Sequence, residues 1–453
     1  MRKSFPLLFI FVLILIMLTY IMAWIGFPAD FQLIKGQEEN LEILFPFHIY
    51  LQREGGEGLL INGQEVSEEL IPLEAGEPMT IKADSPGELN VRFLLFGVIP
   101  LRNLVVRVLP PISVVPGGQS IGVLLQQEGV IVRDHHLVLD KSRRPVYPAR
   151  EAGIEIGDTI LEINGEQITS QYQVGQLLRE IGEAGSRAEL LLKRSEGKRE
   201  LLEVEPLQDY DSGRYMLGIR IDDGAQGVGT LTFYHPETEC YGALGHMVTD
   251  LYTRQAVDLS GGVIVEADIT GINTGQDGMP GEKMGVFLEE GEVLGNIEKN
   301  TSYGIFGSLE ELPQISYFHQ PLSVATGIQV KPGPAQIYTV IEGGEVQEFK
   351  VEIERVRRQG SPSSKGLVIR IVDQGLLEKT GGIVQGMSGS PIVQEGALVG
   401  AVTHVFIQDP TRGYGVLAEW MMMESGLLEE LETDLEGEYP VLPYDPLIEK
   451  NII

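Results

Sequence analysis

Hydrophobic and polar positions alternate along most of this chain, in short runs that glycine-rich turns separate. Two clear examples, residues 58–63 and 89–94, lie within the segment 40–108. A period of two between turn signals is typical of β-strands that bury one face. The pattern predicts a mainly β protein, with a small β module in residues 29–110 to which the sequence assigns no chemistry.

The pattern changes at the N-terminus, where residues 5–28 carry no charge. These 24 positions exceed the ~20 residues with which a helix crosses the hydrocarbon core of a membrane. Two basic residues precede the run and acidic residues follow it, so the positive-inside rule places the remainder of the chain outside the cytoplasm. A cleavable signal peptide is the alternative, but the run is long for one and lacks a small-x-small cleavage pattern. The sequence therefore predicts a signal-anchor over 1–28.

A second block, residues 111–207, begins at a cluster of prolines and glycines that predicts a domain boundary. It contains an apolar strand at 120–124, a glycine-rich loop and strand at 152–165, a helical pattern at 170–181 and a strand at 188–194. This order closely resembles a PDZ domain, which binds an extended peptide along a sheet edge. The resemblance implies that the peptide entrance is lined by Ser120, Ile121, Gly122 and Val123.

A third block, residues 208–435, carries the candidate chemistry, and residues 436–453 form a C-terminal tail. The string Gly386-Met387-Ser388-Gly389-Ser390-Pro391 can place a serine hydroxyl on a tight turn, with backbone N–H groups facing a developing oxyanion. Ser388 is the candidate nucleophile. Gly, Ser and Pro also dominate ordinary turns, so the string alone does not establish a nucleophile. The strands expected after it, at 391–394 and 397–405, support this assignment.

This serine loop and the strands after it are similar to those of chymotrypsin-like serine peptidases, which fold as double β-barrels. The similarity implies that the N–H groups of Gly386 and Ser388 form the oxyanion hole. It also implies a substrate cleft bordered by Val402, Thr403, His404 and Val405. Gly382, six residues before the nucleophile, stands where the family often selects the primary substrate residue. It supplies no acid, so we expect no preference for Lys or Arg.

A serine hydroxyl needs a base, and histidine has the best matched pKa. Of the seven histidines, His246 fits best, because it has small neighbours and precedes Ser388 by 142 residues, in the chymotrypsin order. The acid that orients it is less determined, because five aspartates lie between base and nucleophile: Asp250, Asp258, Asp268, Asp277 and Asp373. Asp373 ends a buried-looking strand 15 residues before Ser388, and spacing alone does not exclude Asp258 or Asp268.

Taken together, the anchor, the PDZ-like block and the segments 245–250 and 380–391 resemble the stage IV sporulation protein B peptidases of endospore-forming bacteria. That resemblance, and not spacing, favours Asp373 as the acid. It implies self-cleavage near the N-terminus, followed by cleavage of the extracytoplasmic domain of a membrane regulatory protein. This cleavage would activate an intramembrane protease and late sigma-factor processing, in the space between forespore and mother cell. The implied partners are thus the chain's own N-terminal segment, that regulatory protein, and the membrane through the anchor.

Composition narrows the alternatives. The chain has 34 basic and 65 acidic residues, a formal charge of −31, which disfavours a nucleic-acid partner. Cys240 is the only cysteine, so the chain can form no internal disulfide. Serine acyl transfer needs no metal or organic cofactor, and we expect neither. Two rival interpretations remain: a broad quality-control protease with a PDZ domain, and a non-catalytic PDZ scaffold.

Overall fold

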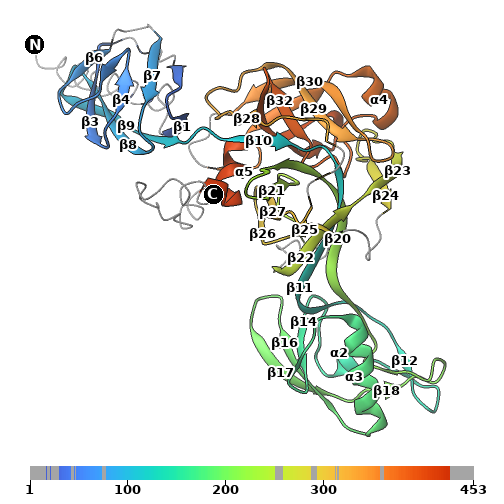
Figure 1. Ribbon diagram of the computed structural model, residues 1–453. Coiled ribbons are helices and arrows are strands. Elements are labelled where there is room, and N and C mark those ends of the chain that lie inside the picture. Colours follow the sequence, from blue (N-terminus) through green and yellow to red (C-terminus); the bar gives the residue numbers. More distant parts are fainter. Residues whose placement is uncertain are drawn as a thin grey trace, which may run out of the picture.

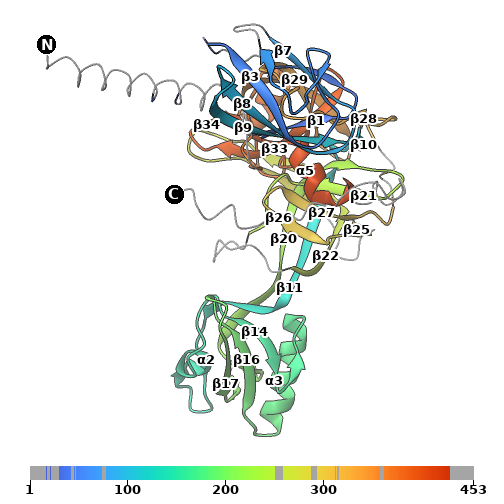
Figure 2. The same ribbon diagram turned by 90° about the vertical axis from the view of Figure 1, so that its left-hand side faces the viewer.

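The computed structural model describes residues 30–41, 45, 47–73, 78–249, 259–286, 293–311, 313, 316–357 and 362–428, and helical positions 17 and 21. Three bodies are visible, each built mainly of strands (Figure 1). A β module, coloured blue, lies beside a larger body whose cores are formed by residues 112–125 and 231–427, called the peptidase body after the resemblance of its serine loop. A third body lies below it in both views (Figure 2). Among the described residues, no helix is long and apolar enough to cross a membrane. The expected anchor lies almost wholly outside them.

The N-terminal module consists of two sheets around one core, as the alternation in this region predicts. One sheet has the order β1-β9-β8-β3-β6 and the other the order β2-β7-β4-β5. β1 is parallel to β9, with Asp30 opposite Val105, and the other pairs are antiparallel. The strands are β1 (Asp30–Ile34), β2 (Glu38–Leu41), β3 (Ile49–Gly55), β4 (Leu59–Ile61), β5 (Gln64–Glu65), β6 (Ile71–Leu73), β7 (Met79–Ala83), β8 (Gly87–Leu95) and β9 (Ile99–Leu109).

Two long antiparallel strands, β11 (Ser120–His135) and β20 (Ile219–Tyr234), join the lower body to the peptidase body (Figure 1). Their register shifts between Gln126 and Ile131, near the point where the ribbon passes from one body to the other. Residues 130–221 pack into the core of the lower body, whereas residues 115–125 pack with residues 231–309 of the peptidase body. The PDZ-like unit is therefore an insertion between two peptidase strands, and its start lies later than the expected residue 111.

The inserted unit has the elements that the sequence predicts between residues 152 and 194. Its elements are β12 (Val138–Leu139), β13 (Pro145–Val146), α2 (Pro148–Glu151), β14 (Thr159–Ile163), β15 (Glu166–Gln167), α3 (Gln171–Glu183), β16 (Ala188–Lys193), β17 (Arg199–Val204), β18 (Leu207–Gln208) and β19 (Tyr215–Met216). Ser170 caps α3 by accepting a hydrogen bond from the Gln173 amide. Val174, Leu178 and Ile181 are the buried residues of α3, one face at helical spacing.

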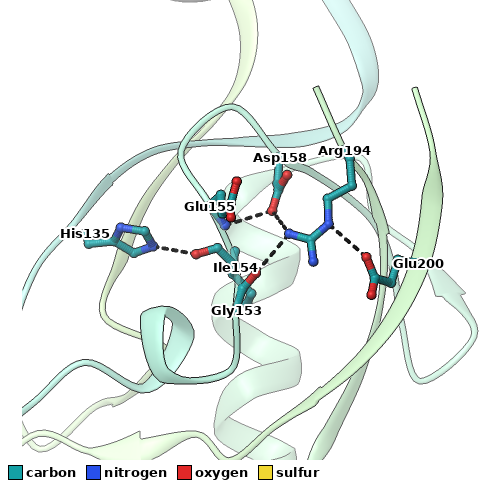
Figure 3. Close-up of polar contacts among 7 residues, drawn as sticks. All are labelled: His135, Gly153, Ile154, Glu155, Asp158, Arg194 and Glu200. Atoms are coloured by element: carbon teal, nitrogen blue, oxygen red, sulfur yellow. Dashed lines mark hydrogen bonds and ion pairs between the residues drawn. The ribbon is translucent and has the colours of Figure 1, made fainter. Parts of the chain in front are cut away.

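A buried ion pair fixes the glycine-rich loop before β14 (Figure 3). The Arg194 guanidinium donates to Asp158 at 2.6 Å, to the Gly153 carbonyl at 2.9 Å and to Glu200 at 3.1 Å. The Asp158 carboxylate, 2% exposed, also accepts from the Glu155 amide at 2.8 Å. These contacts give the turn at residues 157–158 a structural role.

The peptidase body contains one closed barrel of order β29-β30-β31-β34-β33-β32, and α4 (Gln374–Thr380) and α5 (Ala418–Ser425) belong to the same half of the chain. The barrel strands are β29 (Gly333–Val340), β30 (Val346–Val356), β31 (Leu367–Ile371), β32 (Pro391–Gln394), β33 (Ala397–Phe406) and β34 (Asp409–Leu417). Their inner side chains share one core with α5, which contributes Trp420 and Met421.

The other half of the peptidase body is a coiled sheet with strand order β25-β22-β11-β20-β21-β27-β26. Its ends approach one another, since an isolated bridge joins Gly295 of β25 to Leu309, just after β27. The strands not yet given are β10 (Ser113–Pro116), β21 (Cys240–Ala243), β22 (Leu259–Glu266), β23 (Asp268–Asn273), β24 (Glu282–Val286), β25 (Val293–Asn296), β26 (Lys299–Thr301), β27 (Gly304–Ser308) and β28 (Leu322–Ser323). The expected mainly β fold with a PDZ unit is confirmed, whereas of the expected double β-barrel the described residues form one closed barrel and a coiled sheet.

Candidate active site

The nucleophile loop lies between α4 and β32, and two of its glycines have conformations that other residues rarely adopt. Gly386 has φ +91° and Gly389 has φ +94°. A Cβ atom on Gly389 would lie 2.1 Å from the Thr230 carbonyl oxygen, so the loop passes too close to β20 for any side chain. Ser388, between these glycines, remains half-buried. The glycine-rich string therefore presents its serine on a tight turn, as its composition predicts.

Two threonines of β20 hold this loop. The Thr230 hydroxyl donates to the Gly386 carbonyl at 2.8 Å, and the Thr232 hydroxyl donates to the Gly389 carbonyl at 2.7 Å. The Thr230 amide also donates to the Ser388 carbonyl at 3.0 Å. Their spacing of two along a strand puts both side chains on one face. The sequence alone does not reveal this role, because only the fold shows what the threonines face.

The amides of Gly386 and Ser388 have no hydrogen-bond acceptor among the described residues, whereas neighbouring amides do. Met387 donates to the Val384 carbonyl and Gly389 to the Val402 carbonyl. Buried backbone amides are rarely left unpaired, and a pair of them beside a nucleophile is what an oxyanion hole provides. Among the described residues, the Gly386 and Ser388 amides are therefore free to serve as the expected oxyanion hole.

His246 and Ser388 both lie beside residues 403–404 of β33. The Ser388 hydroxyl donates to the Thr403 carbonyl at 2.8 Å, and the His246 ring lies 4.9 Å from the His404 ring, between centroids. The hydroxyl is therefore turned toward β33 in this conformation. Rotation about the Cα–Cβ bond of Ser388 is needed before the base takes its proton, since catalytic contacts are often loose before substrate binds.

The His246 ring is already oriented on its other side. Its Nδ1 lies 2.8 Å from the Met247 carbonyl oxygen, and a carbonyl can only accept, so Nδ1 carries the proton. This tautomer leaves Nε2 with a lone pair for the serine proton. Burial lowers the pKa of His246, and the Met247 carbonyl opposes this effect in part. His246 is thus the neutral base that acyl transfer requires at neutral pH.

Asp373 is not brought to this histidine. It caps α4, where its carboxylate accepts from the Leu376 amide at 3.0 Å and from the Lys350 amide at 3.4 Å. The Thr403 hydroxyl donates to the carbonyl of Ser364, a residue that precedes β31. Asp373, in contrast, follows the end of β31. Nucleophile and aspartate therefore lie toward opposite ends of that strand, and the carboxylate does not orient His246 in this conformation.

The other candidate acids do not fill the position in the described residues. Asp268 is exposed at the start of β23, beside the turn at Gly344, and Asp277 is exposed in the loop before β24. Asp250 and Asp258 lie outside the described residues. The Met247 carbonyl is the group that the structure shows on His246 Nδ1.

The expected cleft residues fall into two sets. Val402 and Thr403 are buried, whereas His404 and Val405 reach the surface. Loss of hydration, with smaller contributions from His246 and Lys365, lowers the pKa of His404 to about 4, so this ring is neutral at pH 7. Gly382 is packed closely, because a Cβ atom there would lie 2.3 Å from the Pro410 carbonyl oxygen. Only part of the expected cleft is therefore open to a substrate.

The expected PDZ entrance is wrong. Ser120 to Val123 of β11 pair with Thr230 to Gly227 of β20 on one edge, and Ile121 to Val123 pair with Glu266 to Ile264 of β22 on the other. Both backbone edges are occupied, so no peptide can add there. The apolar strand entrance that the sequence assigned to the PDZ unit belongs to the peptidase sheet. Within the PDZ unit, α3 lies beside β19 and the start of β20 instead.

A buried lysine beneath the loop was not predicted. The Lys283 amine donates to the Thr339 hydroxyl at 2.8 Å and to the Ser120 hydroxyl at 3.5 Å, and burial lowers its pKa to about 7. Its aliphatic stem lies against Gly386, and its amide donates to the Gln385 carbonyl. Lys283 thus joins both halves of the peptidase body under the oxyanion loop.

Among the described residues, no group of three or more His, Cys, Asp or Glu could hold a metal.

Comparisons with known proteins place two segments in families. Residues 213–422 match the family described as SpoIVB peptidase S55, and residues 141–194 match the PDZ domain family. A search of curated proteins finds no match. Serine peptidase activity, expected from the serine loop, is thereby shown at the level of the family.

Solved structures resembling this chain include the active form of the Rv3671c protease of M. tuberculosis. That form is 14% identical over 45% of this chain and 74% of the other, with a TM-score of 0.24. An inactive mutant of it is 13% identical over 44% and 82%, with a TM-score of 0.23. At these TM-scores the likeness carries no argument about fold or function.

Proposed function

Because residues 213–422 belong to the SpoIVB peptidase family, we propose that this serine peptidase uses Ser388 and His246 and acts outside the cytoplasm in endospore formation. The surroundings of Ser388 carry the assignment of the site. Ser388 stands between two unusual glycines, its own amide and that of Gly386 lack acceptors among the described residues, and His246 lies beside the same strand.

The mechanism follows from these positions. Ser388 Oγ leaves the Thr403 carbonyl and attacks the scissile carbonyl carbon, while His246 Nε2 takes its proton. The Gly386 and Ser388 amides stabilise the oxyanion, and the Met247 carbonyl holds the imidazole from the other side. The protonated histidine then gives its proton to the leaving amine, and water hydrolyses the acyl-enzyme.

The role of Asp373 as the triad acid is a further part of the proposal. Its side chain would have to leave the amides of Leu376 and Lys350 to reach His246. A role in holding α4 next to the nucleophile loop accounts for the contacts that it makes. An Asp373→Asn variant that keeps full activity would favour the capping role, because the asparagine oxygen can still accept from the Leu376 amide although the contact with the Lys350 amide is lost.

The biological role that we propose follows the family. The peptidase would be held at the membrane by residues 1–28, cleave its own N-terminal segment, and then cleave a membrane-bound regulatory protein that restrains an intramembrane protease. The position of the PDZ unit supports a recruiting role. Strand β20 runs from this unit, paired with β11, into the peptidase body, where it holds the nucleophile loop. Tethering on one membrane would raise the effective concentration of the substrate.

A pair of serine variants tests this function. Full-length wild type, Ser388→Ala and Ser390→Ala are expressed side by side with a membrane-anchored candidate substrate, and chain sizes and new N-termini are read. Ser390 is the matched control, because it lies in the same loop, is fully buried, and its hydroxyl makes no hydrogen bond among the described residues. We expect fragments from wild type and Ser390→Ala only. Equal cleavage by Ser388→Ala would refute Ser388 as nucleophile, and rapid digestion of unfolded casein would favour the broad quality-control protease.

A further inference from the structure

The N-terminal module exposes an apolar hairpin tip that its fold does not require. Here "apolar tip" means Phe96, Val98 and Ile99 in the turn between β8 and β9, together with Leu70 beside it. Val98 is 78% exposed and Phe96 56% exposed, and Leu70 and Ile99 are exposed as well. The side chain of Leu70 lies 3.3 Å from the position of a Cβ on Gly97, so these residues form one patch.

The turn has a conformation that is unusual for a large side chain. Phe96 has φ +52°, a region that bulky residues seldom adopt. The Phe96 amide donates to the His48 carbonyl at 3.1 Å, and its ring packs edge-on against Phe47, with centroids 6.1 Å apart. The nine residues 93–101 carry no charge, and an arginine stands at each end of this stretch. The hairpin therefore holds apolar side chains outward on a fixed turn.

Strand direction places this tip on the side from which the chain enters the module. β1 is parallel to β9, with Asp30 opposite Val105, so Asp30, the first residue of β1, lies at the end of the strand pair that is nearer to Ile99. From Val105 to Ile99 the strand extends about 20 Å beyond the level of Asp30. Only one residue separates Asp30 from Pro28, where the uncharged run ends, which allows about 7 Å of chain.

These lengths bring the tip to the membrane if residues 5–28 cross it. A chain that leaves the bilayer at Pro28 and enters β1 without reversing direction carries the apolar tip to the depth of the lipid headgroups or beyond. We propose that the tip inserts into the outer surface of the membrane next to the anchor, as a second contact that fixes how the module faces the bilayer. This inference rests on the anchor in the proposed function.

The arginines at the two ends suit this position. Long basic side chains can keep their charge at headgroup level while apolar neighbours enter the lipid. Arg92 pairs with Glu54 on the sheet below the tip. The module is otherwise rich in acidic residues, so insertion would depend on the apolar side chains and not on attraction to anionic lipid.

A fluorescence measurement on the full chain tests the proposal. The native Cys240 is buried, so a single new cysteine can be labelled selectively in the folded protein. Val98→Cys carries a polarity-sensitive dye at the tip. Ser85→Cys is the matched control, because Ser85 is exposed in the turn before β8, at the opposite end of that strand. Both proteins also carry Ser388→Ala, so that the anchor is retained, and are reconstituted into phosphatidylcholine vesicles with and without lipids bearing a quencher.

We expect a blue-shifted emission that lipid-borne quencher reduces at position 98, and neither effect at position 85. Unchanged thermal unfolding of the labelled proteins checks that the exposed sites tolerate the dye. If the chain floats with the vesicles but position 98 stays in a water-like environment, the anchor stands and the tip proposal fails. If the chain does not float with the vesicles, both the anchor and the tip proposal fail.

Discussion

At the scale of single residues, the site depends on a few backbone positions more than on charged side chains. Gly386 and Gly389 allow the loop to turn, and Thr230 and Thr232 hold its carbonyls away from the nucleophile. Because of that geometry, the amides of Gly386 and Ser388 meet no acceptor in the part of the chain that the structure describes. His246 is buried enough to stay neutral, and the Met247 carbonyl selects its tautomer.

A substitution at Gly386 tests the oxyanion loop. In Gly386→Ala the new Cβ would meet the Lys283 stem at 3.0–3.2 Å, at a φ that disfavours alanine. We expect a loss of about 100-fold in acylation rate, the size of effect seen when one oxyanion donor is displaced. Gly396→Ala is the control, because Gly396 also has a positive φ but lies in the β32–β33 turn with open space around it. Equal rates for the two variants would contradict the assignment.

The pH dependence tests the base. Burial lowers the pKa of His246 below its ordinary 6.5, so the neutral form persists to lower pH. The rate of fluorophosphonate labelling should therefore fall on acidification with a midpoint below pH 6.5. His404→Gln should leave that midpoint unchanged, since the pKa of His404, about 4, keeps its ring neutral there. A midpoint above pH 6.5 would show that His246 is not the titrating base in this environment.

At the scale of elements, local patterns predicted the strands and α3 well, because capping and periodicity are properties of neighbouring residues. The strand of Ser120 to Val123 was assigned to the PDZ unit, which is the wrong body, because a local pattern does not show which strands will pair. Its apolar pattern fits a PDZ strand and a peptidase strand equally, and only the pairing with β20 and β22 decides between them. Lys283 went unnoticed because a single lysine gives no signal of burial, and Asp373 resembles a strand-end acid although it caps α4.

The buried pair in the PDZ unit yields a stability prediction. Arg194→Met leaves the Asp158 carboxylate buried without its cation, which should lower the free energy of unfolding by about 3–5 kcal/mol. Arg187→Met is the control, because the Arg187–Glu203 pair is exposed on both sides and should matter by less than about 1 kcal/mol. Urea unfolding of both variants measures the difference. Equal unfolding midpoints would contradict the claim that the Arg194–Asp158 ion pair stabilises the loop.

At the scale of the whole molecule, the three bodies are connected by specific contacts that the sequence could not reveal. The PDZ unit is inserted into the peptidase sheet, and the N-terminal module docks on α5 and the segment before the barrel. With the Gln32 side-chain amide of β1 oriented so that its nitrogen faces Glu419, it donates to both carboxylate oxygens, at 2.7 and 3.2 Å, and Gly327 donates its amide to the same group at 2.8 Å. Such contacts join residues hundreds of positions apart, beyond the reach of local pattern.

This docking contact should make stability depend on pH. Burial, with a further contribution from Asp30, raises the pKa of Glu419 from 4.5 to about 7. A carboxyl with a raised folded pKa favours the folded state below its unfolded pKa, and that contribution is lost as pH rises through the folded value. Glu419→Gln should therefore gain stability over wild type between pH 4.5 and 7, by about 3 kcal/mol at most. Urea unfolding at pH 4.5 and 8 checks this, and a pH-independent difference between the two proteins would contradict it.

The most direct test of the central claim is to locate the group that a fluorophosphonate modifies. Wild type, Ser388→Ala, Ser390→Ala and His246→Ala are treated with the probe, and the labelled peptide is identified by mass spectrometry. The account predicts a single adduct on Ser388 in wild type and Ser390→Ala, none in Ser388→Ala, and strongly slowed labelling in His246→Ala. Labelling of Ser388→Ala at the wild-type rate, or an adduct on another residue, would contradict the proposed nucleophile.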